Sequence, residues 1–185
     1  QPASQIMDFD SVADLPQQDP KADVEVAVTH SDMNFKDGMI VEGRKGVVKG
    51  YPIVAGIDYA GIVVRSTNPL WKEGDGVVLT GNKAGQFFDG GYSERAMVRG
   101  EWLGAPPPRF SLAQSMLIGT AGITAAQCIH HLETFGEVRP SHGPILVTGA
   151  AGGLGQLAIP MLKSRGFEVI ASTGRKATLE AHLKV

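Results

Sequence analysis

Hydrophobic and polar residues follow two different periods along the chain, and the change falls near residue 110. Before it, short runs alternate between apolar and polar positions and are separated by glycine-containing turns, which is typical of half-buried β-strands. The pattern predicts strands over 22–29, 57–64 and 77–79, and a turn followed by a strand over 90–98. Residues 30–38 are polar and are expected to lead into a turn. This half of the chain therefore favours a compact β barrel or sandwich.

The second half begins after three consecutive prolines and has the period of an α/β protein. A helix is predicted over 111–135, with Ser111 as its N-cap and an interruption near 119–122. An apolar run at 145–147, a glycine-rich turn, a helix and a second apolar run at 167–171 then form a β-α-β unit. Apolar residues at helical spacing mark the buried face of its helix: Leu154, Leu157, Ala158, Met161 and Leu162.

The turn between these two apolar runs carries four glycines within seven residues. A phosphate approaches the N-terminus of a helix only where side chains do not block the backbone. Gly152 and Gly155 stand at the second and third positions of the dinucleotide fingerprint, Ala150 takes the first, and Gly153 and Leu154 lie between them. Strands on both sides give this pattern the context in which it predicts a dinucleotide site. The alternative is a turn that only packs the helix on the strand.

The end of the second apolar run favours NADPH over NADH as the dinucleotide. An NAD site usually places Asp or Glu there for the ribose 2′-hydroxyl. The chain instead reads Ser172-Thr173-Gly174-Arg175-Lys176, whose hydroxyls and cations suit a 2′-phosphate. The alternative is that Arg175 and Lys176 only begin a solvated helix.

Composition limits the classes of protein that fit. The chain has 185 residues, 43% of them hydrophobic, and a formal net charge of −2, which argues against nucleic-acid binding. Its single cysteine, Cys128, excludes an internal disulfide and fits a reducing, cytoplasmic compartment. No apolar stretch is expected to span a membrane. The chain begins at Gln1 and ends with two strands of a sheet that needs about six, so we expect a fragment.

Several segments, taken in order, resemble the medium-chain dehydrogenase/reductases: HSDMNFKDG, PIVAGIDYAG, EGDGVVLTG, GGYSERAMV, GTAGITA and VTGAAGGLG. They are most similar to the zinc-free branch of quinone oxidoreductases and NADPH-dependent acrylyl-CoA reductases, in which HSSLNYKD and TGASGGVG are typical. The resemblance implies a GroES-like β barrel over 1–110 and a connecting helix with a truncated Rossmann domain over 111–185. It also implies a nicotinamide between the two domains and a homodimer of the full-length protein.

The resemblance further implies that no metal takes part. Zinc-binding relatives place Cys where Asn34 stands and His where Ile57 stands, and they carry a four-cysteine structural site. None of the five histidines has metal-ligand spacing with Cys128.

The candidate catalytic residues are Asn34 and Asp58. The Asn34 amide can donate to a substrate carbonyl and accept from the cofactor ribose, or it can simply close a turn. Asp58 lies in an apolar strand and needs a partner, for which Lys36 or Arg95 is suitable; a buried structural ion pair is the alternative. Lys36 and Asp37 can also form a solvated pair.

Three further residues follow from the resemblance or depart from it. Phe35 replaces the usual Tyr, so it lacks a hydroxyl but can pack against the nicotinamide. Thr120 resembles a residue near the nicotinamide, or else caps a helix. Pro160 removes a backbone donor inside the cofactor helix and is expected to kink it near Gln156.

The function expected from these features is NADPH-dependent reduction of a C=C bond conjugated to a carbonyl. When hydride adds to the β carbon, negative charge builds on the carbonyl oxygen, and correctly placed hydrogen bonds can stabilise it without a metal. Acrylyl-CoA or a related 2-enoyl thioester is the first candidate substrate, and a quinone is the second. A non-catalytic NADPH-binding protein and a zinc-independent alcohol dehydrogenase are alternatives, although the latter lacks a suitable His near Asn34.

Overall fold

The computed structural model describes residues 4–174. Their contacts divide the chain into two compact units, Gln1–Gly119 and Thr120–Val185, each of which is described by itself. The domain boundary expected at residue 110 stays a prediction.

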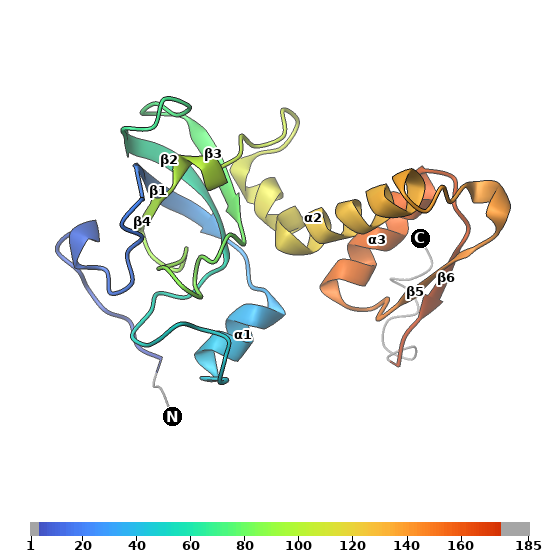
Figure 1. Ribbon diagram of the computed structural model, residues 1–185, viewed down its shortest axis with the longest axis horizontal. Helices are drawn as coiled ribbons and strands as arrows, with labels where there is room; N and C mark the ends of the chain where they lie inside the picture. The colour runs from blue at the N-terminus through green and yellow to red at the C-terminus, as the bar shows by residue number, and fades with distance from the viewer. Residues whose placement is uncertain (1–3, 175–185) are drawn as a thin grey trace. The chain divides into compact units, whose positions relative to one another are not determined.

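The first unit is built on a four-stranded antiparallel sheet in the order β3-β2-β1-β4 (Figure 1). The strands are β1 (Val24–Ser31), β2 (Asp58–Ser66), β3 (Gly76–Thr80) and β4 (Arg95–Val98), close to the predicted positions. Alternate residues of these strands supply most of the core, which includes Val24, Val26, Tyr59, Val63, Val77, Leu79 and Val98. Successive side chains of a strand point to opposite faces of the sheet. The alternation of apolar and polar residues therefore places the apolar side chains on one face, where they form the core.

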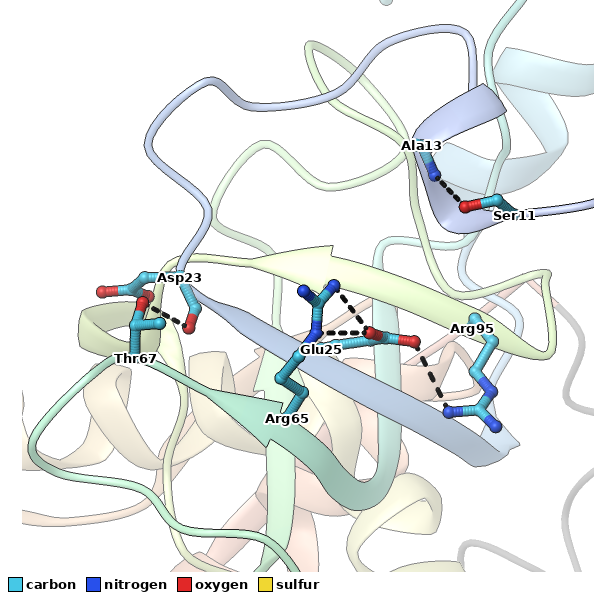
Figure 2. A network of polar contacts seen from close by, with 7 residues as sticks. All are labelled: Ser11, Ala13, Asp23, Glu25, Arg65, Thr67 and Arg95. Carbon is cyan, nitrogen blue, oxygen red and sulfur yellow. Dashed lines mark hydrogen bonds and ion pairs between the residues drawn. The ribbon is translucent and has the colours of Figure 1, made fainter.

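Charged residues bridge the exposed side of this sheet. Glu25 of β1 lies between Arg65 of β2 and Arg95 of β4, and Figure 2 shows its two carboxylate oxygens divided between them. The shortest distances are 3.1 Å to Arg65 and 3.5 Å to Arg95. The side chain of Arg65 is 70% exposed and that of Arg95 is 49% exposed, so the pairs align the strands rather than supply much stability.

A short helix, α1 (Phe35–Val41), replaces the turn that was expected after β1. Its interior contains Gly38, and its length of seven residues leaves too few apolar positions to reveal a helical period. Single-turn 3₁₀ helices η1 (Val12–Asp14) and η2 (Gly100–Trp102) complete the unit.

The helix α2 (Leu112–Thr134) begins and breaks where the sequence predicts. Ser111 and Gln114 exchange hydrogen bonds between side chain and backbone N–H, at 3.2 and 2.9 Å, which is a capping box. Gly119 adopts φ 48° and ψ −159° and interrupts the helix.

By length and composition α2 is long and apolar enough to cross a membrane, contrary to expectation. The break at Gly119 leaves a continuous helical run over 120–134, which is about 22 Å long. That is shorter than the hydrocarbon core of a bilayer, about 30 Å.

The second unit holds the predicted β-α-β arrangement, formed by β5 (Ile145–Thr148), α3 (Gly153–Ser164) and β6 (Val169–Ser172), preceded by η3 (Pro140–His142). Strands β5 and β6 pair in parallel. The helix buries Gly155, Ala158, Ile159 and Leu162, so the expected face is partly wrong: Leu154 is 40% exposed and Ile159 takes its place. Pro160 is exposed within a continuous helix, and the expected kink stays a prediction.

The predicted fold class, antiparallel β followed by the start of a parallel α/β domain, is confirmed.

Candidate functional site

Asn34 connects two carboxylates that are far apart in the sequence. Its Nδ2 donates to Oδ1 of Asp32 at 2.8 Å and to Oδ2 of Asp58 at 3.1 Å. A primary amide has two N–H donors, so both are used and only Oδ1 is left to accept a hydrogen bond. The structure thus brings together the two residues that the sequence analysis selected as catalytic candidates.

The partner expected for Asp58 was wrong. Lys36 Nζ lies 3.4 Å from Gln86 Oε1, and Arg95 pairs with Glu25. Asp58 is fully buried, and its Oδ1 accepts a hydrogen bond from the backbone N–H of Gly81 at 2.9 Å. Neutral N–H donors therefore stabilise this carboxyl group, as a buried carboxylate requires.

Asp32 forms a hydrogen-bonded cluster with Asn34 and Asp58, although it was not among the residues predicted from the sequence. The pairing of Ser31 with Tyr59 between β1 and β2 brings the adjoining Asp32 and Asp58 close together. Burial, followed by the nearby charges of Asp58 and Asp37, raises the pKa of Asp32 from 3.8 to about 7. Asp32 therefore titrates near neutral pH instead of being fully ionised there. The signal for this cluster is the strand register, which the sequence pattern alone does not specify.

Asp37 fixes the start of α1 from a buried position. It is 1% exposed, so the expected solvated pair with Lys36 was wrong. Its carboxylate accepts from the backbone N–H of Asn34 at 2.8 Å and of Ile57 at 3.0 Å. These bonds hold the loop that carries Asn34 against the start of β2.

Tyr92 closes another side of the cluster. Its hydroxyl donates to the backbone carbonyl of Asp32 at 2.9 Å. Burial, together with the charges of Asp37 and Asp32, raises the pKa of Tyr92 to about 12, so this hydroxyl stays protonated.

Gly119 explains why α2 breaks at this point. A Cβ atom at Gly119 would lie 2.1 Å from Oδ2 of Asp32 and 3.0 Å from Oδ2 of Asp58. The backbone approaches the two carboxyl groups so closely that no side chain fits, and the positive φ also favours glycine.

The glycine turn between β5 and α3 has the geometry of a phosphate-binding turn. A Cβ at Gly155 would lie 2.6 Å from the carbonyl oxygen of Gly149 and 2.7 Å from Cα of Ala150. Gly152 is the N-cap of α3, and Gly153, Leu154 and Gly155 form its first turn, whose N–H groups have no partner within the helix. Ala150 is fully buried. These residues fit a pyrophosphate at the helix N-terminus.

The polar end of β6 faces the same turn. The backbone N–H of Ala150 donates to the carbonyl of Ser172 at 3.1 Å. A cavity of about 330 Å³ is lined by Gly149, Ala151, Gly152, Ser172, Thr173 and Gly174. Residues 169–174 contain no carboxylate for a ribose 2′-hydroxyl. Arg175, the predicted partner of a 2′-phosphate, lies outside the described residues.

Phe35 and Thr120 were expected near the nicotinamide. Phe35 is the first residue of α1 and is 80% exposed, with the Arg44 guanidinium 5.9 Å from its ring centre. Thr120 follows Gly119 and is half-buried. Among residues 4–174, no group of three or more His, Cys, Asp or Glu side chains has an arrangement that could hold a metal ion.

The sheet of the first unit and the segments around Asn34 and Asp58 match a known family. Residues 20–131 match the model of the alcohol dehydrogenase GroES-like domain, and the chain belongs to this family. The resemblance noted from the sequence segments is thereby confirmed.

Two curated relatives are similar over most of the chain. Acrylyl-CoA reductase AcuI of Ruegeria pomeroyi is 47% identical over 87% of the chain and 48% of its own length. The putative quinone oxidoreductase YhfP of Bacillus subtilis is 46% identical over 85% of the chain and 47% of its own length. The chain thus spans about half the length of the curated relatives it matches.

Two solved structures are also similar over most of this chain and about half of their own. The yhdH oxidoreductase from Salmonella enterica, in complex with NADP, superposes with a TM-score of 0.86 at 39% identity, covering 96% of this chain and 52% of that one. Bacillus subtilis yhfP with NAD bound superposes with a TM-score of 0.84 at 44% identity, covering 93% and 51%.

Proposed function

We propose that the full-length protein uses NADPH to reduce a C=C bond conjugated to a carbonyl. The observation that carries the proposal is the turn at Gly155, where backbone atoms fill the space that any side chain would need. Ala150, Gly152, Gly153, Leu154 and Gly155 would hold the pyrophosphate at the tip of α3. The relatives named for acrylyl-CoA reduction and the neighbour solved with NADP support this choice.

The preference for NADPH rests on the polar end of β6. Ser172, Thr173, Gly174 and Arg175 would bind the 2′-phosphate, and no acidic residue stands where a 2′-hydroxyl needs one. The neighbour solved with NAD keeps NADH as an alternative. Substituting Arg175→Ala should lower kcat/KM with NADPH by about tenfold or more and leave NADH unaffected, since a charged hydrogen bond contributes about 1.5–3 kcal/mol. An equal effect on both coenzymes would contradict the assignment.

Bound NADPH would supply the hydride, and the residues of the first unit would supply orientation and the proton. Asn34, whose N–H groups are engaged by Asp32 and Asp58, offers Oδ1 as an acceptor to a donor group of the cofactor or substrate. This is the acceptor role expected from the sequence, whereas the N–H groups expected to donate to a substrate carbonyl are engaged by Asp32 and Asp58. Asp58 would act by orienting that amide. Phe35 and Thr120 stay proposed neighbours of the nicotinamide.

Asp32 is the proposed source of the proton that completes the reduction. Phe35 has no hydroxyl to give, whereas Asp32 has a pKa raised to about 7 and is partly open to solvent. A general acid works best when its pKa lies near the working pH.

The proposed substrate is acrylyl-CoA or a related 2-enoyl thioester, converted by addition of hydride to the β carbon and of a proton to the α carbon. The test is oxidation of NADPH by the full-length protein, with acrylyl-CoA and a quinone compared side by side. Turnover with acrylyl-CoA alone is expected. Turnover with the quinone alone would favour the second relative's named activity. Binding of NADPH without any turnover would favour a non-catalytic role.

A homodimer in a reducing cytoplasm completes the proposal. Cys128 is the single cysteine and is exposed as a free thiol, which suits such a compartment.

A further inference from the structure

Five exposed cations and two exposed aromatic rings lie on two segments of the first unit, 35–49 and 83–87. The five cationic side chains are Lys36, Arg44, Lys45, Lys49 and Lys83, and the two exposed rings are Phe35 and Phe87. We call these seven residues the basic surface. The whole chain has a net charge of −2, so this concentration of positive charge is local.

Little negative charge balances the basic surface. Glu42 pairs with Arg44 at 2.9 Å, and Asp37 is buried. Within residues 4–174, Lys36, Lys45, Lys49 and Lys83 form no ion pair. Unbalanced positive charges on adjoining segments create a positive potential, which a bound anion would neutralise.

Gln86 joins the two segments of the basic surface into one rigid unit. Its Nε2 donates to the carbonyl of Val47 at 3.1 Å, and its Oε1 lies 3.4 Å from Lys36 Nζ. The backbone N–H of Lys49 donates to the carbonyl of Gln86 at 2.8 Å. The segments 36–49 and 83–87 are therefore held side by side before any ligand binds.

The aromatic rings carry cations against their faces. The Arg44 guanidinium lies 5.9 Å from the Phe35 ring centre, and Lys83 Nζ lies 5.6 Å from that of Phe87. The exposed Phe87 ring beside the unpaired Lys83 matches a ligand that has both an aromatic base and phosphates, whereas Phe35 stays a proposed neighbour of the nicotinamide. A simple inorganic anion would not stack on an aromatic ring.

We propose that the basic surface binds the phosphorylated adenosine end of a coenzyme A thioester. The inference rests on the proposed function and defines how that substrate is recognised. Asn34 caps one end of α1, and Arg44, Lys45 and Lys49 follow its other end. The helix has seven residues and is about 10 Å long. A pantetheine chain is long enough to connect a thioester near Asn34 with phosphates beyond this helix.

The test compares two substrates that differ only in the nucleotide. Acrylyl-CoA carries it, and the acrylyl thioester of N-acetylcysteamine does not. The double variant Lys45→Gln/Lys49→Gln of the full-length protein should raise KM for acrylyl-CoA about tenfold with little change in kcat. KM for the N-acetylcysteamine thioester and for NADPH should not change. The matched control is Lys21→Gln/Lys72→Gln, which removes two exposed lysines elsewhere on the same unit.

Each other outcome overturns the inference in a distinct way. An unchanged KM for acrylyl-CoA, or an equal rise for both thioesters, shows that the nucleotide is not recognised here. A rise in KM for NADPH alone assigns the basic surface to the coenzyme. If the wild type turns over neither thioester, the proposed function fails. Calorimetric titration with coenzyme A then tests the inference separately. Binding that the double variant weakens and the control variant retains is expected. No binding, or equal binding by both variants, would overturn the inference.

Discussion

The side-chain nitrogen of Asn34 lies 3.1 Å from Oδ2 of Asp58, and the same nitrogen lies 2.8 Å from Oδ1 of Asp32. One neutral amide thus bridges two carboxyl groups from different strand ends. Burial and the neighbouring Asp58 and Asp37 raise the pKa of Asp32 to about 7, whereas the hydrogen bond from Asn34 acts in the opposite direction. The two hydrogen bonds fix the direction in which Asn34 presents its oxygen.

The raised pKa of Asp32 predicts a dependence of stability on pH. An acid whose pKa is higher in the folded than in the unfolded chain binds more protons when folded, so the free energy of unfolding falls as pH rises between the two values. For Asp32 this interval runs from 3.8 to about 7. Asp32→Ser should remove this part of the slope and make the protein more stable than wild type at pH 8. Chemical denaturation over this pH range measures it.

The control for that experiment is Glu73→Gln, which removes one exposed carboxylate and changes the net charge equally. It should keep the wild-type slope. The same loss of slope in both variants would point to net charge instead of Asp32.

The same group predicts a pH dependence of the proposed reaction. If Asp32 donates the proton, kcat/KM with acrylyl-CoA should fall as pH rises through about 7, because the donor is then ionised. Asp32→Ser should lower kcat/KM on the order of 100-fold and abolish the inflection. An unchanged profile in the variant would assign the proton to solvent.

Gly119 should tolerate no side chain while Asp32 is present. In Gly119→Ala the new Cβ meets Oδ2 of Asp32 at 2.1 Å, and the backbone conformation costs about 1–3 kcal/mol in addition. Gly143→Ala is the control, since Gly143 has φ 110° and ψ −175° but open space around it. Gly119→Ala should therefore destabilise more, as measured by urea unfolding.

A double variant separates the clash from the backbone strain. Combined with Asp32→Ser, which removes the atom that the new Cβ meets, Gly119→Ala should lose much of its excess cost. Strict additivity of the two substitutions would show that contact with Asp32 is not the cause.

Gly155 should be required for binding NADPH. Gly155→Ala forces Cβ to within 2.7 Å of Gly149 and Ala150 backbone atoms, so the turn must open and the phosphate loses its donors. We expect binding, followed by NADPH fluorescence, to weaken at least tenfold. Gly38→Ala serves as the control because open space surrounds Gly38 inside α1, and NADPH binding should be unchanged.

Arg99 should matter more to stability than the arginines that bridge the sheet. Its Nε and Nη2 donate to Asp19 at 2.6 and 3.1 Å, and its guanidinium lies 4.5 Å from the Trp102 ring centre. Asp19 is 5% exposed, so Arg99→Ala leaves a buried carboxylate without its partner. Arg65→Ala removes an exposed pair instead. A similar loss of stability in both variants would contradict this distinction.

The sequence by itself determined the elements and the phosphate turn, because these depend on residues close together in the chain. The strands of the first unit, the Ser111 cap, the break near Gly119 and the β-α-β unit all follow from local period and turn chemistry. Among the described residues, α1 and the three short 3₁₀ helices were missed, because three to seven residues are too few to show a period.

Only the tertiary structure decided the chemistry around Asn34. The register of β1 and β2 brings Asp32 to Asp58. Other tertiary contacts give Lys36 and Arg95 different partners and place Gly119 against both carboxyl groups. Long-range pairing sets these distances, and a shift of one residue would turn the same side chains to the opposite face of the sheet. The sequence identified the residue types, whereas the raised pKa of Asp32 and the hydrogen-bond partners of Asn34 depend on the fold.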